Sequence, residues 1–172
     1  MPPSSGGAFE AVAASLRAAE LRRDLTVDEI SAPAGVAPQA IAFAGDVHPP
    51  GHGIDSQLGT GRFILLHDPA SPEGWDGEFR IVVYAQAPLE RDIGSDPLLP
   101  EVAWSWLQSA LNDLGAPRHA MSGTATPVLS TGFGSLAEQD ANAHIELRAS
   151  WTPDGLDLGV HQFGQVLEVG QV

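Results

Sequence analysis

The sequence places a histidine beside a carboxylate at a point where such a pair could act as a general base. His67 and Asp68 stand where an apolar segment meets a loop rich in proline and glycine, and Asp76 follows in that loop. A carboxylate can orient a neighbouring histidine for proton transfer. No G-x-S-x-G nucleophile motif accompanies them. We therefore expect Asp68 to cap the turn before Pro69 and His67 to pack at the strand end, and we predict no catalytic residues.

Two other histidines have a spacing that metal ligands often show, but the backbone between them cannot form the helix that this spacing requires. His48 and His52 are four residues apart, and Asp46 and Asp55 flank them. That spacing brings two ligands to one face of a helix, but the prolines and the glycine between the histidines rule a helix out. We expect an exposed loop over residues 48–59 and predict no metal.

The segment TGFGSLAEQD (131–140) matches a dinucleotide-binding pattern only in part. Gly132, Gly134 and Ala137 fit G-x-G-x-x-A. That pattern binds a pyrophosphate only where it joins a strand to an amphipathic helix. Residues 138–140 do not begin such a helix, so we predict no cofactor.

Two expected strands carry polar side chains on one side. Alternation over residues 78–87 puts Arg80 and Tyr84 on one face, and alternation over residues 143–151 does the same for His144, Glu146 and Arg148. Arginines in these positions could hold an anionic ligand or an acidic partner bidentately. The alternative is a solvated face with cross-strand ion pairs, each worth tenths of a kcal/mol to about 1 kcal/mol.

Loop residues could complete a site at this face. Trp75 lies in a glycine-bracketed loop next to Asp76, whereas the spacing of Trp106 and Trp151 matches buried faces. The full set of candidate ligand-binding residues is Arg80, Tyr84, His144, Glu146, Arg148, Trp75, Asp76 and His67.

Hydrophobic periodicity predicts the elements that must position these residues. Helices are expected from Phe9, over residues 97–114, and from Leu156. Strands are expected over residues 25–30, 39–47, 60–67, 78–87, 118–125 and 143–151. Because short loops join most of the strands, antiparallel hairpins are favoured. We predict an α+β fold with an antiparallel sheet of about five or six strands and three helices.

Composition excludes several classes of function. The 172 residues include 22 Asp or Glu, 8 Arg and no Lys, for a net charge of −14. Nucleic acids and anionic membranes both attract basic surfaces, so we expect no direct nucleic acid and no membrane as partners. The absence of Cys excludes disulfides and thiolate chemistry. The acidity favours a basic protein or peptide as partner.

The length is that of one domain, which we expect over residues 8–172 after a loose tail at residues 1–7. The opening MPPSSGG has neither the basic nor the apolar region of a signal peptide. No stretch is long and apolar enough to span a membrane. We therefore expect a cytoplasmic protein.

Three segments resemble one family. The resemblance is carried by LLHDPASPEGWDGEFR (65–80), DPLLPEVAWSWLQSAL (96–111) and ELRASWTPDGLDLG (146–159). They are similar to an actinobacterial family of proteins of unknown function, numbered three thousand. The loop at 48–59 looks longer than in that family, and the end after Gly159 looks unlike its longer apolar helix. The resemblance implies a cytoplasmic protein with no assigned activity and no established catalytic residues.

The expected order of elements is also similar, as an analogy of fold, to class-one type III secretion chaperones, which are commonly dimers that present a surface to other polypeptides. The leading hypothesis is a non-enzymatic, acidic interaction or adaptor module, chaperone-like and able to form a homodimer. The alternative is a small-molecule binder or hydrolase that uses the polar sheet face and adjoining loops. A third is a structural subunit with an uncovered apolar patch near Trp75 or the last helix.

Overall fold

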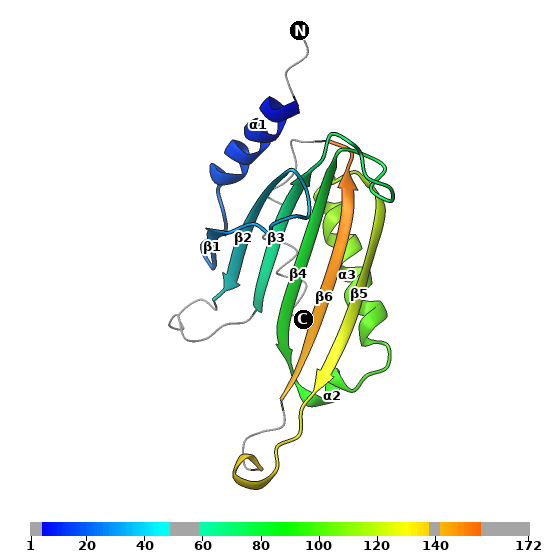
Figure 1. Cartoon of the computed structure of the whole chain (residues 1–172). Coiled ribbons are helices and arrows are strands. Elements are labelled where there is room, and N and C mark those ends of the chain that lie inside the picture. The colour runs from blue at the N-terminus through cyan, green and yellow to red at the C-terminus, as the bar shows by residue number, and fades with distance from the viewer. Residues whose placement is uncertain (1–4, 49–58, 138–141, 156–172) are drawn as a thin grey trace.

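A six-stranded antiparallel sheet forms the centre of the computed structural model, which describes residues 5–48, 59–137 and 142–155 (Figure 1). The expected α+β fold with an antiparallel sheet is confirmed. The elements in chain order are α1 (Ser5–Arg17), β1 (Leu25–Ile30), β2 (Gln39–Val47), β3 (Gly59–His67), β4 (Phe79–Leu89), α2 (Arg91–Gly94), α3 (Leu99–Asp113), β5 (Arg118–Leu129), a 3-10 turn (Gly134–Leu136) and β6 (Ala143–Pro153).

The strands pair in the order β1-β2-β3-β4-β6-β5, and every pair is antiparallel. The first four strands follow one another along the chain, which short loops allow for antiparallel neighbours. After β4 the chain forms α2 and α3 and returns to the sheet as β5. It then turns back as β6, which lies between β4 and β5 and pairs with both. β5 is an edge strand, and it accommodates Pro127 and an irregular register between His119 and Ser122.

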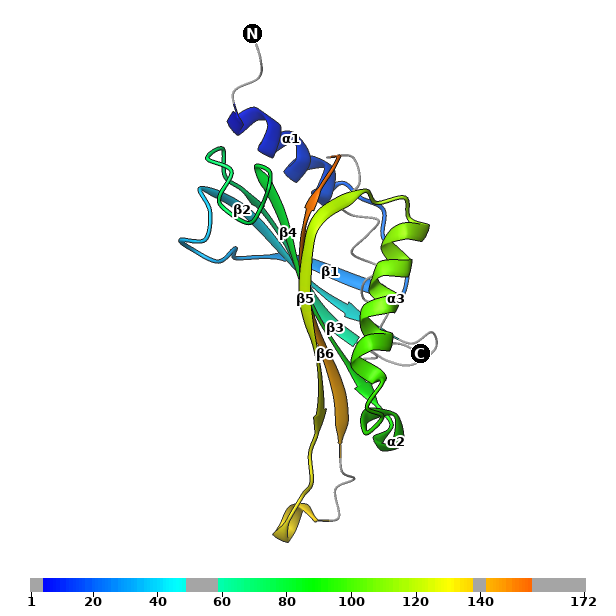
Figure 2. The same ribbon diagram turned by 90° about the vertical axis from the view of Figure 1, so that its right-hand side faces the viewer.

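One face of the sheet is apolar and lies under the helices. Along β6, every second side chain from Ala143 to Trp151 is buried, as the alternation in the sequence predicted. Figure 2 shows α3 lying along this side of the sheet. The side chains that form the common core come from both long helices and from the sheet, and include Phe9, Val12, Leu16, Phe43, Phe63, Leu65, Val83, Leu107, Leu111, Leu147 and Trp151.

The helices differ from the sequence prediction mainly at their ends. α1 begins at Ser5, so residues 5–7 are helical instead of belonging to a loose tail. α3 lies within the predicted range 97–114, and the short α2 before it was not predicted. No helix in the described part of the chain is long and apolar enough to cross a membrane.

The tryptophans follow the prediction in part. Trp151 is buried as expected, whereas Trp106 is only half-buried and Trp104 packs against the core in its place. Two further expectations lie outside the described residues: the helix from Leu156, and nearly all of the loop at 48–59 with His52.

Candidate functional site

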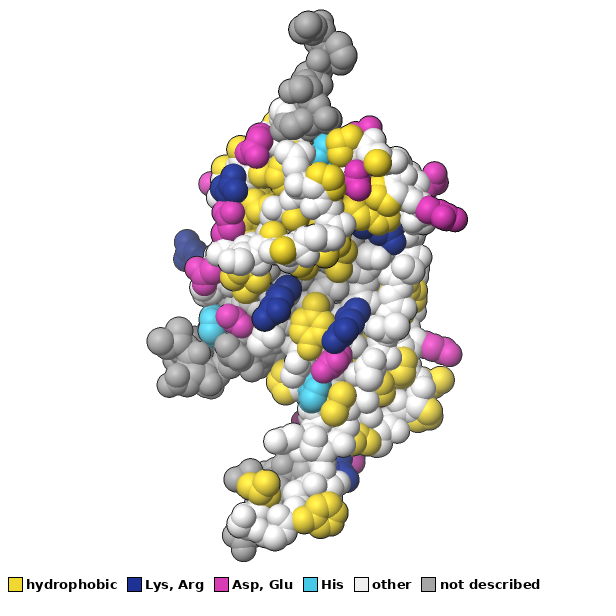
Figure 3. All heavy atoms as spheres, viewed as in Figure 1, with side chains coloured by type: hydrophobic (Ala, Val, Ile, Leu, Met, Phe, Trp, Pro, Cys, Tyr) yellow, Lys and Arg dark blue, Asp and Glu magenta, His cyan; other side chains and the backbone are white. Residues whose placement is uncertain are grey.

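Within residues 5–48, 59–137 and 142–155, no helix covers the second face of the sheet, and we call this face the open face. Figure 2 shows α3 on one side of the sheet and the loops at residues 31–38 and 68–78 on the other. In Figure 3, which views the open face, two dark-blue arginine side chains lie on either side of a yellow one near the middle of the sheet, with acidic and histidine side chains just below them. Charged groups therefore gather on the part of this face that the loops leave uncovered.

The loop between β3 and β4, residues 68–78, covers one end of the open face, and we call it the strap. The backbone N–H of Asp68 donates to the carbonyl of Glu78 over 2.8 Å and closes the base of the strap. Further along, the hydroxyl of Thr152 donates to the carbonyl of Trp75. A Cβ on Gly77 would lie only 2.8 Å from the methyl group of Thr152, so the strap is pressed closely onto β6.

Beyond the strap, the open face forms a hollow of about 810 Å³, a size common for ligand sites. Strand register aligns Arg62, Tyr84 and Arg148 in one row across β3, β4 and β6, and we call this row the cation row. The Arg148 Cζ atom lies 5.3 Å from the centroid of the Tyr84 ring, a cation–π distance. Both arginines are exposed, and within the described residues neither forms a salt bridge.

Two residues further along the strands, a second row crosses the same face. Register aligns Asp46, Thr60, Gln86 and Glu146, and we call this row the acid row. The Tyr84 hydroxyl donates to the Gln86 side-chain oxygen over 2.9 Å. Burial, followed by the nearby Glu146 carboxylate, raises the pKa of Tyr84, so its hydroxyl stays protonated.

The structure brings four of the candidate residues together on the open face, two of which, Tyr84 and Arg148, line this hollow. Tyr84 and Arg148 lie in the cation row, Glu146 lies in the acid row, and the His144 Nε2 atom is 3.5 Å from a Glu146 carboxylate oxygen. Arg62 joins them from β3. These positions follow from the strand alternation that the sequence predicted.

Arg80 lies on the same face but is buried under the strap. It is 7% exposed, and its guanidinium donates to the hydroxyls of Thr152 over 3.1 Å and Ser150 over 2.8 Å. Burial lowers the pKa of Arg80. Because the strap covers it, Arg80 does not line the hollow, although the sequence suggested that it would stand beside Tyr84.

The remaining candidates lie away from the hollow. His67 points to the opposite, helix-covered face, where its ring lies against Phe9 and Phe79 and its Nδ1 is 2.7 Å from the Gln39 side-chain oxygen. It is 1% exposed, which agrees with the expected packing role. Asp76 and Trp75 are strap residues. The candidate residues that a small-molecule binder or hydrolase would use are therefore divided between two faces and a loop: Arg80, His144 and Glu146 lie on the open face, His67 lies on the helix-covered face, and Asp76 lies in the strap.

A histidine that the sequence analysis did not single out fastens the strap. His119 Nε2 donates to the backbone carbonyl of Asp76 over 2.7 Å, and Nδ1 donates to the carboxylate of Asp154. Only a protonated imidazole donates from both nitrogens. These two hydrogen bonds raise the pKa of His119, the one to Asp76 contributing most. No sequence signal joins the three residues, because 43 and 35 positions separate His119 from its partners.

We expect the strap contact of His119 to depend on pH. Since its folded-state pKa is raised, its stabilising effect is fully present below the unfolded pKa of about 6.5 and is lost as the pH rises through the folded value. The free energy of unfolding of the native protein should therefore exceed that of His119→Gln at about pH 5.5, and the difference should shrink by about pH 8.5. Urea denaturation at both pH values measures it. A difference that stays constant with pH would contradict this role.

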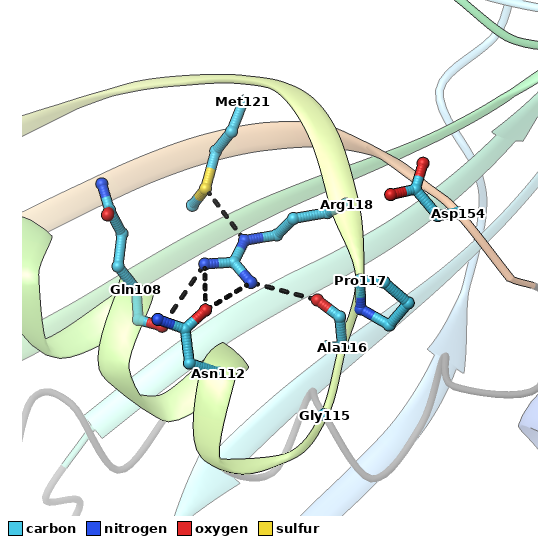
Figure 4. Close-up of a pocket in the computed structure, with 8 residues that line it drawn as sticks. All are labelled: Gln108, Asn112, Gly115, Ala116, Pro117, Arg118, Met121 and Asp154. Carbon is cyan, nitrogen blue, oxygen red and sulfur yellow. Dashed lines mark hydrogen bonds between the residues drawn. The ribbon is translucent and has the colours of Figure 1, made fainter.

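A separate hollow, of about 690 Å³, lies between the end of α3 and the start of β5, and Arg118 is one of the residues that line it (Figure 4). The guanidinium donates to the backbone carbonyls of Ala116 and Gln108 over 3.0 and 3.3 Å and to the Asn112 side-chain oxygen over 3.1 Å. Its Nε lies 3.3 Å from the Met121 sulfur. A cation that satisfies carbonyls at a helix C-terminus ties that end down, so Arg118 holds α3 against β5.

The described residues contain no group of three or more His, Asp or Glu placed to hold a metal ion. Fold and site together define an α+β protein with one helix-covered face and one open, charged face. A family model described as protein of unknown function, DUF3000, matches residues 5–169, and the chain therefore belongs to this family, as the resemblance predicted. No curated protein and no solved structure matches the chain.

Proposed function

We propose that the protein is a non-enzymatic binding module that holds a ligand bearing an anionic group against the open face. The observation that carries the proposal is the cation row, in which Arg62 and Arg148 are exposed on either side of Tyr84 without a salt-bridge partner among the described residues. In a chain with a net charge of −14, arginines held in this way are available to a ligand. Guanidinium groups bind carboxylate or phosphate groups bidentately.

Binding is a better interpretation than catalysis. The sheet separates His67 from the adjacent His144 and Glu146, and Asp76 lies in the strap, so the candidate histidines and carboxylates do not all converge on one point. The Tyr84 hydroxyl donates to the Gln86 side chain and its ring lies against the Arg148 guanidinium, so Tyr84 positions groups that a ligand could contact. A small-molecule binder at the open face is compatible with this proposal, whereas the hydrolase lacks a supporting arrangement.

The test compares two double variants on an array of short peptides that contain single acidic residues. Arg62→Ala with Arg148→Ala should weaken binding at least about tenfold, because each lost charge-assisted hydrogen bond is worth about 1.5–3 kcal/mol. The matched control, Arg17→Ala with Arg23→Ala, removes the same charge from another part of the surface and should bind like the native protein. Equal binding by both variants would contradict the proposal.

A second candidate function is an adaptor for a basic protein or peptide, chaperone-like and able to form a homodimer. Exposed acidic residues at α2 and α3 favour it: α3 has no basic side chain, and Glu90, Asp92, Asp96, Glu101 and Asp113 are all exposed. A partner steered by these charges should be released by added salt. Retention of a basic partner at about 0.5 M salt would count against this surface. We also propose that the protein is located in the cytoplasm and comes from an actinobacterium.

A further inference from the structure

The open face carries charges of both signs in a fixed order. The cation row is the nearer of the two rows to the strap, and the acid row lies two residues further along the strands, toward Ala143 of β6. Arg148 and Glu146 are on the same strand and point to the same side, since only Leu147 separates them. No salt bridge joins the two side chains; the half-buried Glu146 carboxylate lies 3.5 Å from Nε2 of His144 instead. Arg148 can therefore engage an anionic group of a ligand, and the Glu146 carboxylate, shared with His144, a cationic one.

The distance between the cation row and the acid row equals the distance between side chains i and i+2 of an extended peptide. Two residues of an antiparallel strand span about 6.8 Å. In an extended peptide, side chains at positions i and i+2 also lie on one side and the same distance apart. A peptide lying along the strands can thus place an acidic side chain over the cation row and a basic one over Glu146.

The hollow is also long enough for an extended segment. A second hollow of about 580 Å³ shares Thr60 and Gln86 with the first and continues to Pro88 and His144. From Val82 to Pro88 the face extends six residues, about 20 Å. Ile64 and Val82 are half-buried and provide an apolar floor between the strap and the cation row.

We propose that the open face binds an extended peptide segment carrying an acidic and a basic side chain two residues apart. This inference rests on the proposed function and adds the second charge and its position. A purely acidic segment would meet repulsion from Glu146 and from the net charge of the chain. A purely basic segment would meet repulsion from Arg62 and Arg148.

The experiment uses seven-residue peptides with blocked ends and identical composition, each with one Asp and one Arg and a fluorescent label. In one peptide the two charges are at positions i and i+2, and in the other they are adjacent, so that they point to opposite sides. Fluorescence anisotropy with the full chain should give at least about tenfold tighter binding for the i, i+2 peptide, the loss expected for one charged contact. Equal affinities would overturn the inference.

Two variants separate this inference from the function on which it rests. A third peptide carries Gln in place of the Arg at position i+2. Glu146→Gln should abolish the preference for the Arg peptide over this Gln peptide and leave the contribution of the Asp unchanged. Arg62→Ala with Arg148→Ala should remove the contribution of the Asp. If only the arginine variant weakens binding, the proposed function stands and the two-charge ligand is wrong. If neither variant weakens binding, both are wrong.

Discussion

Replacing Gly123 with alanine should lower the free energy of unfolding by about 3 kcal/mol, the upper range for overpacking a well-filled site. A Cβ at this position would lie 2.3 Å from the backbone carbonyl oxygen of Arg148 and 2.5 Å from a ring carbon of Trp104. A strand carbonyl cannot retreat without loss of the β5–β6 pairing. Trp104, in turn, packs against the core from α3. Gly123 therefore sets how closely both β6 and α3 approach β5.

Urea denaturation of Gly123→Ala and Gly155→Ala provides the measurement and its control. A Cβ on Gly155 meets no heavy atom within 4 Å, so this variant should stay within about 1 kcal/mol of the native protein. Similar free energies of unfolding for the two variants would show that the approach of β5 to β6 is not set by Gly123. Gly123 pairs with Ala149, the residue after Arg148. A displaced β6 backbone would move Arg148, so Gly123→Ala should weaken ligand binding at the open face as well as stability.

The second large effect is expected at His67, where a change to alanine should cost about 3 kcal/mol, comparable to removing a large core side chain. The ring is 1% exposed and lies 4.3 Å, between centroids, from that of Phe79. Its loss also removes the hydrogen-bond partner of the Gln39 side chain. The fold of the remaining core should persist, since the neighbouring apolar residues are unchanged.

His144→Ala is the matched control for His67→Ala. The side chain of His144 is 26% exposed on the open face, and its replacement should change the free energy of unfolding by less than about 1 kcal/mol. Thermal or urea unfolding distinguishes the two. If His67→Ala were as stable as His144→Ala, the packing role of His67 would be wrong, and its place among the ligand-binding candidates would need to be reconsidered.

The sequence contained the information for much of the open face. Alternation of apolar and polar residues in β4 and β6 placed Tyr84, Glu146 and Arg148 on one side. The same rule, counted from Phe63 and Leu65, places His67 on the core side. Local periodicity is sufficient for such assignments, because a strand turns every second side chain to the same face.

Other features depend on contacts between distant parts of the chain and could not be predicted from local patterns. The burial of Arg80 depends on the path of the strap, which includes left-handed backbone at Ser71, Gly74 and Asp76. The bridge from His119 to Asp76 and Asp154 joins three separate loops or strand ends. Neither arrangement has a repeating signature in the sequence.

The strap limits the length of ligand that the open face can bind. Arg80 stands in β4 at the position four residues before Tyr84, on the same face. A relative with a shorter connection between β3 and β4 would leave this third guanidinium open and lengthen the binding track by about 14 Å, the span of four strand residues. The number of ligand residues that the sheet can hold is then determined by the length of one loop, while the strands beneath it stay the same.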